Sequence, residues 1–274
     1  MTSPPGRAFG PIVRPWQRYL RPPDITTVRP HAEPYRAGTG RLGVLLLHGF
    51  TGSPLSMRPW AEHFATDGFR VALPRLPGHG TTWQDLNTTT WSDWYSTAEL
   101  EFTSLATECD KVFVAALSMG ASLALRLAER YGDQVAGITL VNPFISQRDP
   151  RVRMLPLLRR LTPSFPGVVN DIAKPGVDEG GYHRLPLTAL QSLIAAWPQL
   201  HAELGKVSSP LLIYQSSVDH VVDTSSVPLI MASVSSSDLT LRSLERSYHV
   251  ATLDYDAEEI FTGSSEFFRR VAKD

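Results

Sequence analysis

The sequence predicts an α/β fold in which a mostly parallel, twisted sheet is covered by helices on both faces. The first observation is that strand-like and helix-like stretches alternate from about residue 41 to the end of the chain, as they do in consecutive β-α-β units. The second is that strand-like stretches such as residues 112–117 (VFVAAL) are almost continuously apolar. Strands buried on both faces have that composition, whereas strands with one wet face alternate apolar and polar residues.

The elements follow one another in a regular order. We expect strands at residues 44–47, 69–73, 112–117, 135–141, 211–215 and 239–244, and helices at about residues 53–67, 90–105, 118–131 and 256–272. Residues 74–90 are rich in Gly, Pro and Thr and are expected to form a long loop.

Local signals place several helix ends. Ser53 followed by Pro54 is typical of a helix start, and Gly68 of a helix stop. Thr90 and Asp93 have the spacing of a capping box. The apolar residues that follow at helical spacing are expected to face the core: Trp91, Trp94, Ala98, Phe102 and Leu105.

The predicted core is interrupted and extended by two further segments. Residues 1–40 carry many prolines and arginines, which favours an extended arm over a helix or a central strand. Residues 147–206 hold seven prolines and no clear strand, and they read as a cap inserted over the sheet. We therefore divide the chain into an arm (1–40), an α/β core (41–146 and 207–274) and a cap (147–206).

Composition excludes several classes of protein. The 274 residues carry a net charge of −1, which removes the usual electrostatic reason to propose nucleic-acid binding. One cysteine, Cys109, allows no intrachain disulfide and no cysteine-based metal site. No apolar run approaches the length of a transmembrane helix, and no signal-peptide core is visible. A cytoplasmic location is expected, and the composition leaves the oligomeric state open.

The main candidate for chemistry is Ser118, in the stretch ALSMG at residues 116–120. It follows an apolar strand and opens a helix, which is the context of a nucleophile elbow. Such a turn is tight, so small neighbours are required. Gly120 meets that need, whereas Ala116 stands in place of the usual first glycine and adds one methyl group. The alternative is that Ser118 is only a helix N-cap.

A serine hydroxyl needs a base, and the base needs an orienting acid. In this fold type the order along the chain is Ser, acid, His, which indicates Asp219 and His249. Each of the three residues follows a strand of the predicted parallel sheet, so they can meet at its carboxyl edge. The runners-up are Asp223 as acid and His220, read as solvent-exposed, as base. The remaining candidates are read as surface or satisfied polar residues: His31, His63, His183 and His201.

Attack on an ester carbonyl also creates a negatively charged oxygen that fixed donors must meet. The backbone N–H of Met119, at a helix start, and that of Phe50 are the candidate donors. Gly49 and Gly52 would let the chain approach the substrate. His48 is expected to hold loops together and not to catalyse.

These segments resemble the α/β-hydrolase superfamily, and within it the bacterial monoacylglycerol lipases and small carboxylesterases. The resemblance runs from about residue 40 to the end and is loose in the cap. Its matching stretches are LLLHGFTGSP (45–54), SMRP (56–59), LPRLPGHGT (73–81), LSMG (117–120), DHVV (219–222) and SYHVATLDYD (247–256). Ala116 and Ala121 depart from the family's elbow, which bears on turn geometry and not on the chemistry.

The resemblance implies an α/β-hydrolase fold with Ser118, Asp219 and His249 as the catalytic triad and Phe50 and Met119 as oxyanion donors. It implies a serine esterase acting on monoacylglycerols or short- to medium-chain esters, with no metal or cofactor. Two alternatives stay open: another chemistry on the same fold (C–C hydrolysis, acyl transfer or perhydrolysis), or a non-catalytic ligand-binding homologue.

The cap combines apolar and basic residues. Its apolar residues either pack the cap on the sheet or line an acyl tunnel under a mobile lid: Val152, Met154, Leu155, Leu157, Leu158, Leu161, Val168 and Val169. Its arginines form either a solvated face or a patch that makes transient contact with a lipid surface: Arg148, Arg151, Arg153, Arg159 and Arg160.

Overall fold

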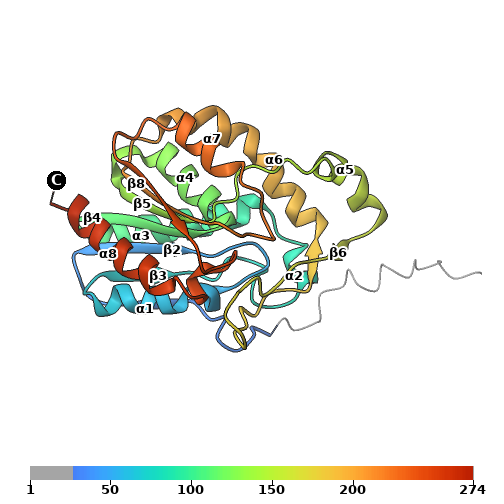
Figure 1. Cartoon of the computed structure of the whole chain (residues 1–274), viewed down its shortest axis with the longest axis horizontal. Helices are drawn as coiled ribbons and strands as arrows, with labels where there is room; N and C mark the ends of the chain where they lie inside the picture. The colour runs from blue at the N-terminus through green and yellow to red at the C-terminus, as the bar shows by residue number, and fades with distance from the viewer. Residues whose placement is uncertain (1–26, 274) are drawn as a thin grey trace, which may run out of the picture.

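The computed structural model describes residues 27–273, and a seven-stranded sheet forms its centre (Figure 1). The strands lie in the order β1-β3-β2-β4-β5-β8-β9. All neighbours are parallel except β1, which pairs antiparallel with β3 at one edge. The predicted, mostly parallel sheet is therefore confirmed. The strand bounds are Tyr35–Ala37 (β1), Leu42–Leu47 (β2), Arg70–Leu73 (β3), Lys111–Leu117 (β4), Val135–Val141 (β5), Leu211–Ser216 (β8) and Leu239–Leu244 (β9).

Helices cover both faces of this sheet (Figure 1). Alternate residues of one strand serve the two sides: in β2, Leu45 and Leu47 belong to one buried cluster, and Val44 and Leu46 to the other. Since both clusters exclude water, the strand has no polar face, which explains its continuous apolar sequence. One face carries α1 (Arg58–Thr66) and α8 (Ala257–Val271); the other carries α3 (Trp91–Glu108), α4 (Met119–Tyr131), α6 (Leu187–Glu203) and α7 (Ser226–Ser233).

The predicted helix ends are present. Ser53 caps a short 3-10 turn, Pro54–Met57, that leads into α1, and its Oγ accepts a hydrogen bond from Leu55 N at 3.3 Å. The Thr90 N–H donates to Asp93 Oδ2 at 2.8 Å, which completes the expected capping box of α3. In the apolar stripe that follows, Trp91 is partly buried. The other four residues are fully buried: Trp94, Ala98, Phe102 and Leu105.

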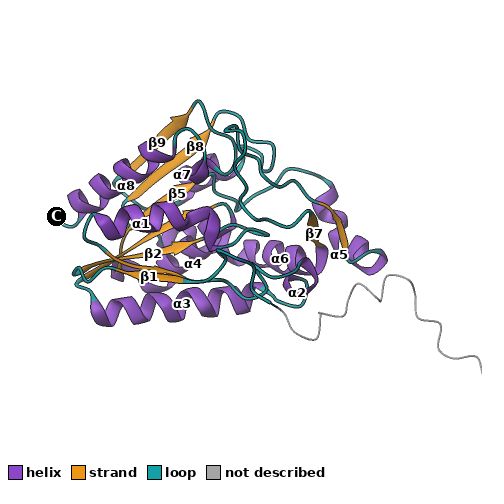
Figure 2. Cartoon of the chain, turned by 90° about the horizontal axis from the view of Figure 1, so that it is seen from below, coloured by secondary structure: helices purple, strands orange, loops and turns teal. Residues whose placement is uncertain are grey.

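The chain between β5 and β8 leaves the sheet. It forms α5 (Arg151–Leu161), the paired short strands β6 (Ser164–Pro166) and β7 (Arg184–Pro186), and then α6. Figure 2 shows α5 and β7 at the end of the molecule away from the C-terminus. The expectation that residues 147–206 hold no clear strand is wrong for β6 and β7. Each has three residues and includes a proline, so neither leaves an apolar run in the sequence.

Three further elements escape the sequence pattern. β1 is a three-residue strand inside the segment expected to be an arm, and it pairs only at the sheet edge. A single helical turn, α2 (Trp83–Leu86), interrupts the expected loop 74–90. α7 is a short helix whose sequence is apolar around most of its circumference, so it has no amphipathic period.

The described part of the expected arm contacts the core. Arg29 N donates to Gly80 O at 2.8 Å, and the Arg29 guanidinium lies 4.8 Å from the centre of the Tyr182 ring, in the segment between β6 and β7. Ala32 is buried. Residues 27–34 therefore run along the turn at Gly80 before β1 begins, and the remainder of the expected arm, residues 1–26, lies outside the described residues.

Candidate active site

Ser118 stands at a strained turn between β4 and α4. Its backbone angles are φ 54° and ψ −117°, a left-handed region that residues with a Cβ seldom occupy. Gly120 makes this possible, because a Cβ there would lie 2.1 Å from the carbonyl oxygen of Leu47. The turn also forms with alanines at positions 116 and 121, both fully buried, so these departures from the family's elbow leave its geometry intact.

Asp219 and His249 form a buried pair at the same edge of the sheet. Asp219 Oδ2 lies 2.7 Å from His249 Nδ1, and Asp219 Oδ1 accepts the N–H groups of Val221 and Val222 at 2.9 Å each. Burial raises the pKa of Asp219, but the His249 ring and these donors outweigh it, so the net shift of the pKa is downward. The carboxylate is therefore ionised and directs the Nδ1 proton of the ring.

The electrostatic surroundings of His249 favour its protonated form. Burial of the ring lowers its pKa, and the carboxylates of Asp219, Glu179 and Asp171 raise it by more, so that the net shift is upward. A base in this setting accepts a proton readily and holds the resulting positive charge beside Asp219.

Asn142, at the end of β5, connects the Ser118 turn to the His249 loop. Its Nδ2 donates to the carbonyl of His249 at 2.8 Å, and its φ of 45° turns the chain away from the strand. The preceding residue, Val141, accepts the N–H of Ser118 at 3.0 Å. The turn at Ser118 and the loop of His249 are thus attached to adjacent residues, the last of β5 and the one that follows it.

The structure brings the expected acid and base together. It places the expected nucleophile, Ser118, after β4, which β5 separates from β8 in the sheet. Within residues 27–273, Ser118 Oγ makes no hydrogen bond to His249. Catalytic hydrogen bonds of this kind are often long before substrate binds. The completed triad is therefore a proposal, taken up below.

The two expected oxyanion donors flank Ser118. In the described part of the chain, neither the N–H of Phe50 nor that of Met119 has a hydrogen-bond acceptor. Gly49 lies so close that a Cβ there would be 3.3 Å from Ser118 Cβ. Thr51, at φ 64°, completes the bend that brings this turn to Ser118.

His48 joins the turn that begins at Gly49 to the loop at Leu76, as we expected of a residue that holds loops together. Its Nε2 accepts the N–H of Leu76 at 3.2 Å, and its Nδ1 donates to the carbonyl of Gly49 at 3.0 Å. The ring meets His79 edge to face at 4.9 Å. Burial lowers the pKa of His48 to about 4, so the ring is neutral near pH 7.

The runner-up residues have other partners. Asp223 accepts the N–H groups of Arg148 and Ser225 at 2.6 and 2.8 Å, so it organises a loop. His220, whose side chain is half exposed, pairs with Asp171. The other histidines lie apart: His63 is near Asp67, His201 contacts the carbonyl of Ile145, and His31 and His183 are exposed.

Three residues near His249 escape sequence reasoning: Asn142, Asp171 and Glu179. The last two belong to the segment between β6 and β7, where no periodicity marks a buried position. Glu179 Oε1 accepts the N–H of Asn170 at 2.8 Å, while its Oε2 faces Gly52, 3.7 Å from the position of a Cβ there. Burial is the main cause that raises the pKa of Glu179.

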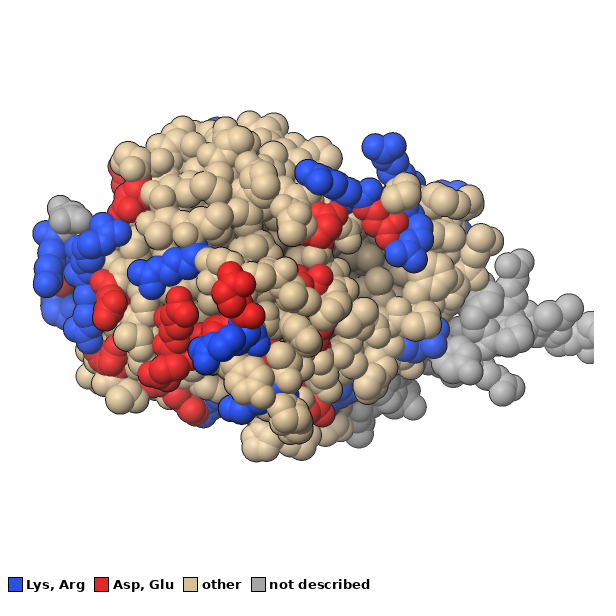
Figure 3. All heavy atoms as spheres, viewed as in Figure 1, with Lys and Arg blue, Asp and Glu red and all other residues tan. Residues whose placement is uncertain are grey.

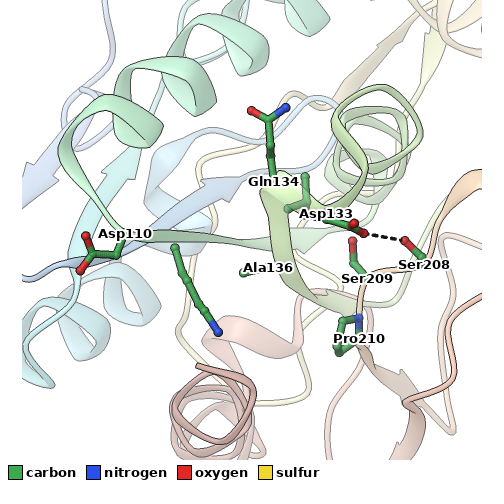
Figure 4. Close-up of a pocket in the computed structure, with 9 residues that line it drawn as sticks. Asp110, Asp133, Gln134, Ala136, Ser208, Ser209 and Pro210 are labelled. Atoms are coloured by element: carbon green, nitrogen blue, oxygen red, sulfur yellow. Dashed lines mark hydrogen bonds between the residues drawn. The ribbon is translucent and has the colours of Figure 1, made fainter. Parts of the chain in front are cut away.

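A pocket of about 310 Å³ lies elsewhere, at the opposite edge of the sheet (Figure 4). Lys111, Val135 and Pro210 line it, at the starts of β4, β5 and β8, whereas Ser118 follows the end of β4. This pocket is therefore separate from the candidate active site.

Comparison with known proteins places the chain in a family. The family model described as serine aminopeptidase, S33, matches residues 40–256. A thermostable monoacylglycerol lipase of Bacillus sp. (strain H-257) is 39% identical over 248 residues, which cover 88% of this chain and 96% of that protein. A carboxylesterase of Bacillus subtilis (strain 168) is 25% identical, over 87% of this chain and 97% of that protein.

Solved structures agree with these matches. A structure of the metagenome-derived lipolytic enzymes LipS and LipT superposes with a TM-score of 0.86 at 40% identity, covering 89% of this chain and 100% of that one. With the sheet order, the strained turn at Ser118 and the buried Asp219–His249 pair, these matches show that the chain belongs to the serine aminopeptidase S33 family of α/β-hydrolases.

Proposed function

We propose that the chain is a serine esterase that hydrolyses monoacylglycerols or short- to medium-chain carboxylic esters. The observation that carries this proposal is the 2.7 Å contact between Asp219 Oδ2 and His249 Nδ1 at the sheet edge where Ser118 forms its strained turn. The choice of substrate is supported by the names of two relatives, a monoacylglycerol lipase and a carboxylesterase.

The reaction begins at Ser118. Its Oγ attacks the ester carbonyl carbon while His249 Nε2 accepts the hydroxyl proton, and the carbonyl electrons move onto the oxygen. That oxyanion accepts the N–H groups of Phe50 and Met119, which have no acceptor of their own in the described chain. Asp219 holds the imidazole in the tautomer whose Nε2 is free to take the proton.

The second half of the reaction reverses the proton's path. The carbon–oxygen bond to the alcohol breaks as protonated His249 gives its proton to the leaving oxygen, and an acyl-enzyme remains. Water, deprotonated by His249, then attacks the acyl carbon, and the proton passes back to Ser118 as the carboxylic acid leaves. No metal or organic cofactor enters these steps.

We assign residues 147–206 as a cap over this site. Its loop between β6 and β7 brings two carboxylates, Asp171 and Glu179, to the His249 side. On the opposite side its helix α6 contributes Leu193 and Trp197 to the main apolar core. The segment is therefore anchored to the core through α6, while its loop between β6 and β7 places carboxylates beside His249.

The outer surface of the cap suits transient contact with a lipid surface. Its exposed apolar residues are between 36% and 66% accessible: Met154, Leu157, Leu161, Phe165 and Val168. Figure 3 shows basic side chains gathered over α5, and Arg151, Arg153 and Arg160 are exposed there. Apolar residues interleaved with arginines favour anionic membrane surfaces. Within residues 27–273 no helix combines the length and apolarity needed to cross a bilayer.

Vesicle binding tests this surface. We expect the protein to sediment with vesicles containing anionic lipid, and the triple variant Met154→Ser/Leu157→Ser/Leu161→Ser to stay in solution while it hydrolyses a water-soluble ester at the wild-type rate. Equal binding of both proteins would contradict the assignment. A cytoplasmic location stays a prediction.

A rate profile tests the proposed function. We expect hydrolysis of p-nitrophenyl esters and of monoacylglycerols, with monoacylglycerols preferred over methyl esters of equal chain length, and no hydrolysis by Ser118→Ala. Adding competing alcohols or peroxide identifies acyl transfer or perhydrolysis by its products. Absence of ester cleavage in every assay would refute the proposal and leave a binding protein with a hydrolase fold.

A further inference from the structure

Asp171 is a buried carboxylate that the cap places between the two loops carrying Asp219 and His249. It is 8% exposed and follows Asn170, whose φ of 54° turns the chain at this point. Its Oδ2 accepts the backbone N–H of His249 at 3.2 Å and that of His220 at 3.0 Å. Its Oδ1 lies 2.7 Å from Nδ1 of the His220 ring. Every polar contact of this side chain is thus directed to the acid and base loops.

These contacts connect four residues in a closed circuit: Asp171, His220, Asp219 and His249. Asp219 and His220 are neighbours in the chain: Asp219 holds the His249 ring at 2.7 Å, while His220 binds Asp171, which in turn binds the His249 backbone. Asp219 therefore fixes the side chain of His249, and Asp171 fixes its backbone. The Asp171 side chain is thus hydrogen-bonded to the Asp219 loop and to the His249 loop at the same time.

Further hydrogen bonds hold the same two segments together. The N–H of Val250 donates to the carbonyl of Asp171 at 3.1 Å. In the reverse direction Asp254, beyond His249, accepts the N–H groups of Ala173 and Lys174 at 2.6 and 3.0 Å. The cap is thus attached to the His249 loop by contacts that run both ways, and among them the Asp171 side chain also reaches the Asp219 loop.

We propose that Asp171 is a positioning residue through which the cap sets the relative orientation of Asp219 and His249. Hydrogen bonds from N–H groups to an ionised carboxylate are stronger than neutral ones, which suits a group that must fix two loops. The kinetic side of this inference rests on the proposed esterase function.

The charge of Asp171 gives the proposal a distinctive readout. The groups facing His249 are Asp219 from the loop after β8, and Asp171 and Glu179 from the cap; His220 faces Asp171. Removing one negative charge lowers the pKa of His249. A variant lacking the Asp171 charge should therefore lose activity at a lower pH than the wild type does, which a purely structural defect would not cause.

The main experiment compares Asp171→Asn with the wild type on a soluble p-nitrophenyl ester. The amide loses the negative charge, and its NH₂ group must face either Nδ1 of His220 or the two backbone N–H groups that the carboxylate accepts. We expect kcat to fall on the order of 10- to 100-fold, as small displacements of catalytic groups do, with KM within about threefold. We also expect the acid limb of the pH profile to move to lower pH. A kcat within about twofold of wild type and an unmoved limb would overturn the proposal.

His220, whose ring contacts Asp171, offers an independent variant. His220→Gln removes the ring contact with Asp171 from a half-exposed position, so the protein should fold even where Asp171→Asn does not. We expect a smaller loss in kcat, about threefold to tenfold by the same reasoning. The kcat of the double variant should match that of Asp171→Asn alone, because both changes interrupt the same circuit of four residues. Simple multiplication of the two losses would contradict a shared role.

Two controls separate positioning from stability. Asp149→Asn removes a cap carboxylate paired with Arg151 at the surface and should leave kcat unchanged. Asp254→Asn weakens the same cap attachment and should lower Tm without moving the acid limb. If Asp254→Asn moves the limb as far as Asp171→Asn, cap attachment alone explains the effect and the proposal is wrong.

A spectroscopic measurement keeps this proposal distinct from the esterase function. The proton shared by His249 Nδ1 and Asp219 should give a far-downfield proton NMR signal, assigned by its loss in Asp219→Asn. We expect Asp171→Asn and His220→Gln to shift or broaden it without any substrate. An unchanged signal in both variants would refute the positioning role, whereas failure of all ester assays would refute only the function.

Discussion

Asp219 and His249 contact each other through a single short hydrogen bond, Oδ2 to Nδ1 at 2.7 Å, with both side chains almost completely buried. They follow β8 and β9, which are neighbouring parallel strands, so the sheet itself brings their loops together. The bond fixes which ring nitrogen carries the proton, and that choice leaves Nε2 available to a serine.

Replacing Asp219 tests that tautomer control. Asp219→Asn keeps the shape but presents an amide to the ring, so we expect kcat to fall by about 10³- to 10⁴-fold with little change in Tm. Asp223→Asn, four residues further along, is the matched control and should keep wild-type kcat because Asp223 contacts only the loop at Arg148 and Ser225. Equal losses in both variants would argue against the assignment of the acid.

The pH dependence of kcat/KM reports the state of His249. Burial lowers the pKa of this ring, and the carboxylates of Asp219, Glu179 and Asp171 raise it by more, so the net shift is upward from 6.5. The base works only when neutral, so activity should fall as pH drops through a midpoint above 6.5. A midpoint clearly below that value in a soluble-ester assay would show that the carboxylates do not dominate.

Two glycines beside Ser118 should respond differently to the same substitution. Gly120→Ala forces a Cβ to within 2.1 Å of a backbone oxygen, so we expect a loss of about 3 kcal/mol in the free energy of unfolding. Gly49→Ala places its Cβ 3.3 Å from Ser118 Cβ and should lower kcat on the order of tenfold while Tm changes little.

Urea unfolding together with steady-state kinetics separates the two outcomes. An active, stable Gly120→Ala variant would mean that the turn at Ser118 is looser than its backbone angles indicate.

His48 should make the fold sensitive to acid. Burial lowers its pKa in the folded chain to about 4, against 6.5 in an unfolded chain. Between these values the unfolded state binds more protons, so stability falls as pH falls, by roughly 3 kcal/mol over the window. His79, also buried with a lowered pKa, acts in the same direction.

The variant His48→Gln isolates this contribution. Its Tm should be lower than that of the wild type near neutral pH, because the N–H of Leu76 loses its acceptor. As the pH is lowered, the Tm of His48→Gln should fall less steeply than that of the wild type. His183→Gln, at an exposed position, is the control. Parallel Tm curves for His48→Gln and the wild type would contradict the assignment.

The sequence predicted the parallel core, because buried parallel strands are continuously apolar. Since the residues after such strands lie at one edge of the sheet, Ser118, Asp219 and His249 could be named as a candidate triad from strand positions together with the Ser–acid–His order of this fold type. The fit of Ala116 into the elbow could not be judged in advance, because it depends on how closely β4 packs against its neighbours Leu47 and Leu140.

The contribution of residues 147–206 could not be predicted in the same way. Asp171 and Glu179 lie in a segment without helical or strand period, and their burial arises from contact with loops about 50 or more residues away. β1 escaped prediction because three residues at a sheet edge leave no apolar run. Residues held by tertiary contact alone carry no local signal.

Covalent labelling of Ser118 tests the central claim most directly. A serine-directed phosphonate, added in stoichiometric amount and located by peptide mass spectrometry, should attach at Ser118 and abolish ester hydrolysis in proportion to labelling, while His249→Ala should label far more slowly. Complete labelling at another residue, or full hydrolytic activity after Ser118 is blocked, would contradict the account.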